Sequence, residues 1–477
     1  MILFKRTLHL LIFVSMAKAA IPARPPLPLL PIPTARQVQW QKSELIMFLH
    51  FGVNTFTDRE WGDGTEAPAL FNPNKLDAQQ WAKVARDAGF ETLILTAKHH
   101  DGFCLWPSRY TEHSVKSSPW KNGRGDVVEE LSQACKKFGL KMGLYLSPWD
   151  RHEPSYGQGA AYNQHYSAQL RELLTQYGPV HEIWFDGACG EGPNGKRQVY
   201  DFAAFWALVR QLQPQAVMFS DAGPDVRWIG NENGHAGETC WSMIDQDRVK
   251  IGGSQTDYLN SGDIHGTDWV PGECDVSIRK GWFWHPDQAP KTVDELLDIY
   301  WKSVGRNGVL LLNVPPDRSG RIDAQDVTVL RDFRQRLNTL FADNLARRAR
   351  ITAEKTRGGD AAFAASRVVD ERQDTYWATD DSVTSATLEL SWPKAQSLNI
   401  VCLREPVVLG QRIEKYRVDA WGETGWITLT SGATIGNKKL DRFRRTHTTR
   451  LRIVLEKSRA CPLLSEVGVY WDPTAGE

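Results

Sequence analysis

The chain has 477 residues with equal numbers of basic and acidic side chains, 57 Lys plus Arg and 57 Asp plus Glu, and a formal net charge of zero. This length exceeds what one hydrophobic core usually organises, so we expect two domains. The charge balance provides no attraction to nucleic acid or to an anionic membrane, and we expect neither as a partner. The seven cysteines show no C-x-x-C spacing, so we assign no metal site, and no cofactor is expected.

The first 35 residues predict an export signal followed by an extended lead-in. Lys5 and Arg6 form a positively charged region, residues 8–16 an apolar region, and residues 17–19 an A-x-A cleavage site. The apolar run is too short to span a bilayer as a helix. We therefore expect residues 1–19 to be a signal peptide, residues 20–35 a proline-rich lead-in, and the protein to be exported, either periplasmic or secreted.

Strand-like apolar runs alternate with helical periodicity from residue 45 to about 340. Strands are expected at 45–49, 91–97, 142–146, 182–185, 216–220 and 309–314, with weaker ones at 238–244 and 276–283. Helices are expected at 76–89, 127–138, 162–177, 201–212, 294–304 and 321–343. This alternation predicts a parallel sheet with covering helices, which we interpret as a catalytic barrel over 36–343.

Beyond Arg350 the helical periodicity disappears and short alternating runs follow, separated by Gly, Pro, Asn and Asp. The pattern predicts an antiparallel β-sandwich over 350–474. Residues 374–379 (DTYWAT) resemble the entry of discoidin-like, galactose-binding modules, so a sugar-binding role and a purely structural role are both open. Cys402 and Cys461 lie in this region and are candidates for a disulfide in an oxidising compartment.

Polar side chains follow three of the predicted strands at the point where each strand ends. His50 follows the first strand, His99 and His100 follow the second, and Asp186 follows the run that ends in Trp184 and Phe185. The carboxyl ends of parallel barrel strands meet at one face, so we expect these groups to share a pocket. Asp186 is the candidate nucleophile.

Several of these motifs resemble family 29 of the glycoside hydrolases, the retaining exo-α-L-fucosidases. The matching segments are 50–52 (HFG), 60–61 (EW), 98–103 (KHHDGF), 184–187 (WFDG) and 303–308 (SVGRNG). Residues 221–232 (DAGPDVRWIGNE) look closer to the branch that prefers α-1,3- and α-1,4-linked fucose on branched oligosaccharides. The resemblance implies a (β/α)8 barrel and hydrolysis of terminal α-L-fucose from an oligosaccharide or glycoconjugate.

Retaining hydrolysis needs two carboxyl groups about 5 to 5.5 Å apart, one to attack the anomeric carbon and one to protonate the leaving oxygen. Asp186 fits the first role. For the second role Glu232 matches the family position and lies in a loop bounded by glycines, while Glu273 and Glu238 remain alternatives. The presence of both Asp186 and Glu232 argues against a non-catalytic sugar-binding protein.

The resemblance also implies which side chains hold the sugar. His50, His99 and His100 would hydrogen-bond the fucose hydroxyls, Glu60 would accept from another, and Trp61 and Trp184 would line the pocket. The methyl group of fucose needs an apolar seat, for which Trp284 and its neighbours Trp282 and Phe283 are candidates, although a core role is equally open. A retaining barrel glycosidase for another sugar remains the alternative function. The sequence leaves the aglycone and the oligomeric state open.

Overall fold

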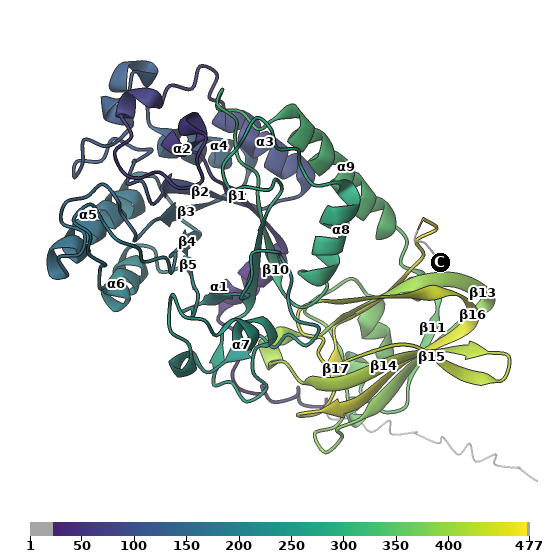
Figure 1. Ribbon diagram of the computed structural model, residues 1–477. Helices are drawn as coiled ribbons and strands as arrows, with labels where there is room; N and C mark the ends of the chain where they lie inside the picture. The colour runs from purple at the N-terminus through teal and green to yellow at the C-terminus, as the bar shows by residue number, and fades with distance from the viewer. Residues whose placement is uncertain (1–21, 475–477) are drawn as a thin grey trace, which may run out of the picture.

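The computed structural model describes residues 22–474, which form a barrel followed by a C-terminal region of antiparallel sheet (Figure 1). The predicted signal peptide, residues 1–19, lies outside the described residues. Eight parallel strands close the barrel in the order β1-β10-β9-β6-β5-β4-β3-β2. Their bounds are β1 Leu45–Leu49, β2 Thr92–Lys98, β3 Lys141–Leu146, β4 Glu182–Trp184, β5 Val217–Ser220, β6 Val226–Trp228, β9 Gly272–Ser277 and β10 Val309–Asn313. The predicted fold class is confirmed.

Two of the expected strands are wrong. Residues 238–244 contain only β7 (Met243–Ile244), which pairs antiparallel with β8 (Asp268–Trp269) outside the barrel. The sixth barrel strand is instead β6, which follows β5 after five residues with no helix between them. The seventh barrel strand is β9, whose last two residues are the first two of the strand expected at 276–283. β6 is too short, and β9 too rich in acidic residues, to produce an apolar run.

Helices cover the outside of the barrel, and α1 closes the end at which the strands begin. Trp40 of α1 donates from its indole to Glu182 Oε2 at 3.0 Å, at the first residue of β4. The helices are α1 Ala35–Ser43, α2 Val53–Thr57, α3 Ala78–Ala88, α4 Val127–Phe138, α5 Ala160–Gln176, α6 Phe202–Leu212, α7 Thr256–Ser261, α8 Val293–Lys302 and α9 Ala324–Leu340. Six of them, α3 to α6, α8 and α9, occupy the predicted helical segments.

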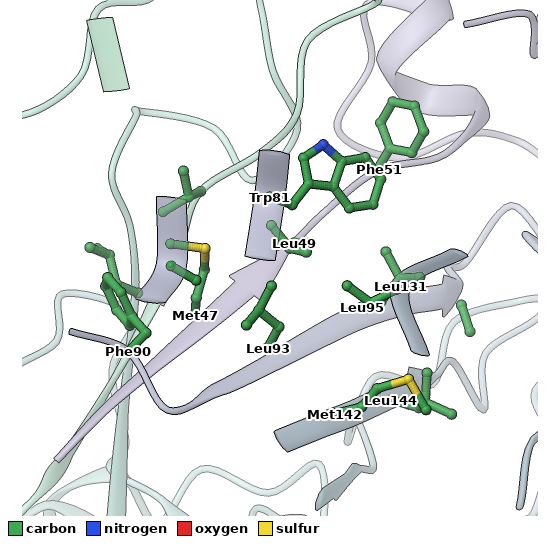
Figure 2. Packing of buried hydrophobic residues seen from close by; sticks show 14 of the residues in the cluster. Met47, Leu49, Phe51, Trp81, Phe90, Leu93, Leu95, Leu131, Met142 and Leu144 are labelled. Atoms are coloured by element: carbon green, nitrogen blue, oxygen red, sulfur yellow. The ribbon is translucent and has the colours of Figure 1, made fainter. Parts of the chain in front are cut away.

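Side chains point alternately outward and inward along each barrel strand, and the two sets belong to two separate hydrophobic clusters. In β1, Met47 and Leu49 pack outward against the helices, in a cluster that includes Trp81 and the β2 residues Leu93 and Leu95 (Figure 2). The intervening side chains point into the barrel, where they form a second cluster: Ile46, Phe48, Ile94, Tyr145, Trp184, Phe219 and Leu311. Because side chains alternate with a period of two, the inward row of each strand leads to the face where the strands end.

The C-terminal region is antiparallel throughout. Its main sheet has the order β11-β13-β16-β14-β15, with β18 paired to β13. The strands are β11 Arg350–Ala353, β13 Ala386–Arg404, β14 Ile413–Gly422, β15 Gly425–Gly432, β16 Lys439–Ser458 and β18 Glu466–Tyr470, and a separate pair consists of β12 Trp377–Ala378 and β17 Leu463–Leu464.

The suggested disulfide between Cys402 and Cys461 is wrong, because all seven cysteines are free. Cys402 is buried in β13 within the core that also contains Tyr470. Cys461 lies elsewhere, with its sulfur 3.1 Å from a guanidinium nitrogen of Arg412. The two thiols therefore occupy separate environments.

The barrel and the C-terminal region share buried contacts. The Glu44 carboxylate, just before β1, lies 2.6 Å from Arg404 and 2.8 Å from Lys438. Burial by itself would raise the pKa of Glu44, but these two cations lower it to about 2. Apolar contacts continue the interface, since Tyr470 packs edge-on against Phe341 with their ring centroids 5.1 Å apart.

The proline-rich lead-in adds a second attachment from the start of the chain. The Leu29 amide donates to the Leu409 carbonyl at 2.9 Å, and Arg412 donates to the Leu27 carbonyl at 2.6 Å. These contacts join the segment before the barrel to the C-terminal region. The C-terminal region therefore contacts segments at both ends of the barrel.

A chain that ends at Asp343 is expected to be insoluble or unstable, although it keeps every candidate catalytic residue. The truncation removes both cations that pair with Glu44 and exposes Phe341 and the apolar surface around it. Comparing soluble yield and melting temperature with the full chain measures the effect. A soluble truncated protein that hydrolyses an aryl fucoside at the full-chain rate would contradict this expectation.

Candidate active site

A cavity of about 330 Å³ opens where the barrel strands end. We call it the central cavity; its lining residues are Phe48, His50, Glu60, Trp61, His99, His100, Tyr145, Trp184, Asp186, Ala188, Glu232, Asp275 and Trp282. The inward rows of the strands supply many of them, as in β4, where Trp184 faces the interior and Asp186 lies two residues further along. The structure thus brings together all but one of the predicted site residues.

Both oxygens of the Asp186 carboxylate have a hydrogen-bond donor. The Tyr145 hydroxyl donates to Oδ2 at 2.9 Å, and the Ala188 amide donates to Oδ1 at 2.7 Å. His100 Nε2 lies 3.9 Å from Oδ2. These contacts fix the orientation of the carboxylate at the cavity surface, as required for a nucleophile that must attack along one direction.

Glu232 reaches the same cavity from the loop that follows β6. Loss of water around its carboxyl raises the pKa of Glu232, the Trp282 indole opposes this by donating to Oε2 at 3.3 Å, and the negative charges of Asp186 and Glu60 raise it further. A carboxyl group with a raised pKa retains its proton at higher pH, which suits a general acid.

The two alternative acids lie elsewhere. Glu273 is fully buried in the barrel interior, where its Oε1 accepts from the Trp184 indole at 2.7 Å, and it is absent from the cavity lining. The Glu238 side chain is 89% exposed and lies 3.8 Å from Arg306. Of the three candidates, the structure therefore places Glu232 alone beside Asp186.

The cavity histidines are neutral. Burial lowers the pKa of His50 to about 3, partly offset by its contact with Asn313, and burial also lowers the pKa of His99 and His100. His50 Nδ1 lies 2.9 Å from Asn313 Oδ1, whose amide nitrogen already donates to two oxygens. Nδ1 therefore carries the His50 proton, and Nε2 is left as an acceptor for a hydroxyl group.

Aromatic rings form the floor and rim of the cavity. Trp184 stacks on Phe219 with their centroids 3.9 Å apart and an interplanar angle of 7°. Trp61 is 59% exposed and meets Trp149 and His100 edge-on. An exposed indole at the rim of a polar cavity is a surface on which a sugar ring can stack.

The prediction that Trp284 borders this pocket is wrong. Its indole points away and donates to Asp323 Oδ2 at 3.4 Å, beneath the guanidinium of Arg279. Trp282, two residues earlier, lines the cavity instead. The segment after β9 turns over the rim, so neighbouring aromatic residues face different directions.

Sequence reasoning missed Tyr145 and Asp275. Tyr145 is the penultimate residue of a strand that was predicted, so its position near the other strand ends was a usable signal. Asp275 lies in β9, where burial raises its pKa well above the usual value and the nearby Glu232 adds to the effect, which favours the protonated carboxyl. The Trp228 indole donates to its Oδ1 at 2.9 Å.

Within residues 22–474, no three or more His, Cys, Asp or Glu side chains are grouped so that they could hold a metal ion. In the same range, no helix is both long and apolar enough to cross a bilayer.

The barrel has a cavity where its strands end, with one carboxylate fixed by hydrogen bonds and a second carboxyl whose pKa is raised. This is the architecture of a glycoside hydrolase. Residues 34–339 match the alpha-L-fucosidase family model, and the chain belongs to that family, glycoside hydrolase family 29. It is an α-L-fucosidase.

Individual relatives extend over almost the whole chain. Alpha-L-fucosidase 1 of Arabidopsis thaliana is 50% identical over 455 residues, which cover 94% of this chain and 90% of the relative. Among solved structures, SpGH29 has a TM-score of 0.90 at 40% identity and covers 94% of this chain and 100% of its own. A Ruminococcus gnavus GH29 fucosidase in complex with fucose has a TM-score of 0.87 at 37% identity, covering 96% and 97%.

Proposed function

We propose that this enzyme removes terminal α-L-fucose by a retaining double displacement, with Asp186 as nucleophile and Glu232 as general acid and base. The observation that carries the proposal is that both carboxyl groups line one cavity of about 330 Å³. Their environments differ in the way the two roles require. Asp186 is held by two donors, whereas the surroundings of Glu232 favour its protonated form.

In the first step an Asp186 oxygen bonds to the anomeric carbon while the bond from that carbon to the aglycone oxygen breaks. Glu232 gives its proton to the departing oxygen, leaving a β-fucosyl ester on Asp186. In the second step Glu232, now a carboxylate, takes a proton from water as the water oxygen attacks the same carbon. The ester bond breaks, α-L-fucose leaves, and both side chains return to their initial states.

The sugar would be held by the side chains that the resemblance assigns. His50 would accept a hydrogen bond from a sugar hydroxyl at Nε2, because its Nδ1 proton is donated to Asn313. His99, His100 and Glu60 would bind further hydroxyls, while Trp61 and Trp184 would pack on the ring. Trp282 takes the place expected for Trp284 and offers the apolar seat for the methyl group.

The stereochemistry of the product tests the retaining mechanism. Proton NMR of a reaction in progress should show α-L-fucose first, followed by slow mutarotation to the equilibrium mixture. Retention arises because two inversions at one carbon cancel. Initial release of β-L-fucose would instead show a single displacement and would remove the covalent role of Asp186.

We propose that the substrate is a branched oligosaccharide that carries fucose in an α-1,3 or α-1,4 linkage, so that the rest of the oligosaccharide is the leaving group. The resemblance of residues 221–232 supports this, and so does a second hollow of about 700 Å³ that shares Glu232 and Trp282 with the central cavity. The protonated oxygen must lie at Glu232, so a bulky aglycone can extend into that space. Comparing initial rates on α-1,2-, α-1,3- and α-1,4-linked oligosaccharides tests the preference, and faster α-1,2 hydrolysis would refute it.

Export and the division into domains are further parts of the proposal. An exported protein should begin after Ala19, which N-terminal sequencing of the mature chain would show. The proposed modules are a catalytic barrel over 36–343 and a discoidin-like module over 350–474. In the motif that suggested the module, Trp377 is fully buried and its indole donates to the Lys355 carbonyl at 2.9 Å, which favours a structural role for that residue.

A further inference from the structure

His285 lies between two carboxylates at the rim of the central cavity. Its Nε2 is 2.5 Å from Glu60 Oε1, and its Nδ1 is 2.9 Å from Asp58 Oδ1. The imidazole is 11% exposed, whereas the side chains of Asp58 and Glu60 are 47% and 38% exposed. A ring that faces an acceptor on both nitrogens satisfies both when it carries two protons.

Glu60, the cavity-lining partner, is held at its other oxygen as well. Its Oε2 accepts from the Trp282 backbone amide at 2.8 Å. Gly281 lies close to the same carboxylate, because a Cβ at that position would collide with Glu60 Oε1 and displace it. The segment 281–285 therefore encloses this carboxylate with a backbone donor, a bare glycine and an imidazole.

The same contacts reach the general acid. The Trp282 side chain lines the central cavity, and its indole donates to Glu232 Oε2 at 3.3 Å. A continuous series of hydrogen bonds thus runs from His285 through Glu60 and the Trp282 backbone to the tryptophan that touches Glu232. A movement of Glu60 would alter its proposed contact with the sugar and the position of Trp282 against Glu232.

We propose that His285 is a positioning residue of this fucosidase, which fixes Glu60 for sugar binding and, through Glu60, seats Trp282 against Glu232. The inference rests on the proposed roles of Glu60 and Glu232. His285 is absent from the cavity lining, so its effect is exerted through Glu60.

The charge of the ring gives the arrangement a pH dependence. Burial lowers the pKa of His285, but the hydrogen bonds and charges of Glu60 and Asp58 outweigh it and raise the pKa above its usual value. Arg318 lies 3.5 Å from Asp58 Oδ1, the same oxygen that faces His285 Nδ1. The imidazolium form is present below this raised pKa, and the hold on Glu60 weakens as the pH rises through it.

Replacing His285 by Phe keeps a flat ring but removes both donors. His285→Phe is expected to weaken fucose binding, measured by calorimetry, and to raise KM for an aryl fucoside about tenfold, with a smaller change in kcat. His285→Gln keeps one donor and should show an intermediate KM that no longer rises with pH. His165→Phe is the matched control, because His165 is 12% exposed, lies 3.6 Å from Glu153 and is not among the cavity-lining residues.

A double-mutant cycle separates positioning from a general effect on the fold. If His285 acts through Glu60, then Glu60→Gln with His285→Phe should bind fucose about as weakly as Glu60→Gln alone. Asp58→Asn should move the alkaline rise of KM to lower pH, because one of the two charges that favour the imidazolium is lost. Additive losses in the cycle, or a wild-type KM profile in both His285 variants, would overturn the proposal.

The binding test is independent of the assignment of Asp186 as the nucleophile. Fucose binding requires no turnover, so failure of Asp186 as the nucleophile would leave the predicted coupling between His285 and Glu60 unchanged. Conversely, additive losses would refute the positioning role and leave the double displacement intact. Melting temperatures of all variants identify any substitution that unfolds the protein. If His285→Phe unfolds it, His285→Gln replaces that variant in the test.

Discussion

Asp186→Asn is expected to reduce kcat on an aryl fucoside by roughly four orders of magnitude. The amide cannot form the glycosyl ester, yet its oxygen can still accept a hydrogen bond from Tyr145 or Ala188, so the cavity should keep its shape. Fucose binding measured by calorimetry should therefore change little. Wild-type kcat in this variant would remove Asp186 from the mechanism.

Azide distinguishes the nucleophile from a residue that merely supports it. In Asp186→Gly the side chain is gone, and azide can attack the anomeric carbon from the face that the carboxylate occupied. The product should be β-fucosyl azide, formed by one inversion. Asp275→Asn is the control, because this carboxyl lines the same cavity and its raised pKa favours a protonated form that resembles an amide. Its loss should be far smaller and should not be rescued by azide.

The barrel was predictable wherever a strand or helix has a clear apolar run or a clear hydrophobic periodicity. Residues 45–49 and 309–312 are continuous apolar runs, and they became parts of the neighbouring strands β1 and β10. β9 was misplaced because it carries Glu273 and Asp275 inside the barrel, which no hydrophobic pattern signals. β6 was missed because three residues have no measurable period, and because the usual helix between parallel strands is absent before it.

The candidate site was predictable to the extent that its residues end strands. His50, His99, His100 and Asp186 all follow apolar runs, and a closed parallel barrel brings such positions together. His285 was missed because its partner Glu60 is 225 positions away in the chain. The choice among Glu232, Glu273 and Glu238 likewise depended on which way each side chain points, and that follows from tertiary packing alone.

The distribution of carboxyl groups explains how one barrel separates their roles. Glu273 lies deep in the barrel beside Glu182, where burial and that neighbour raise its pKa well above the usual value and so favour its protonated form. Burial likewise raises the pKa of Asp275, two residues nearer the mouth. These groups add little negative charge beneath Asp186, so an anionic nucleophile can form without a buried cluster of like charges.

Glu232→Gln should reduce the rate on a fucosylated oligosaccharide by about 10²- to 10⁴-fold, and much less on an aryl fucoside with a good leaving group. Only the poor leaving group needs a proton in the transition state. The raised pKa of Glu232 predicts that wild-type kcat falls on the alkaline side, as the acid loses its proton. In Glu232→Gln that alkaline fall should disappear for the aryl substrate.

Controls and product stereochemistry complete the Glu232 test. Glu238→Gln should leave both rates near wild type, because that side chain is exposed and outside the central cavity. Glu273→Gln, in the barrel interior, should affect both substrates alike. In Glu232→Gly, azide should attack the fucosyl ester on Asp186 and yield α-fucosyl azide, the opposite anomer to that from Asp186→Gly. Equal losses on the two substrates, with no α-azide formed, would show that another group supplies the proton.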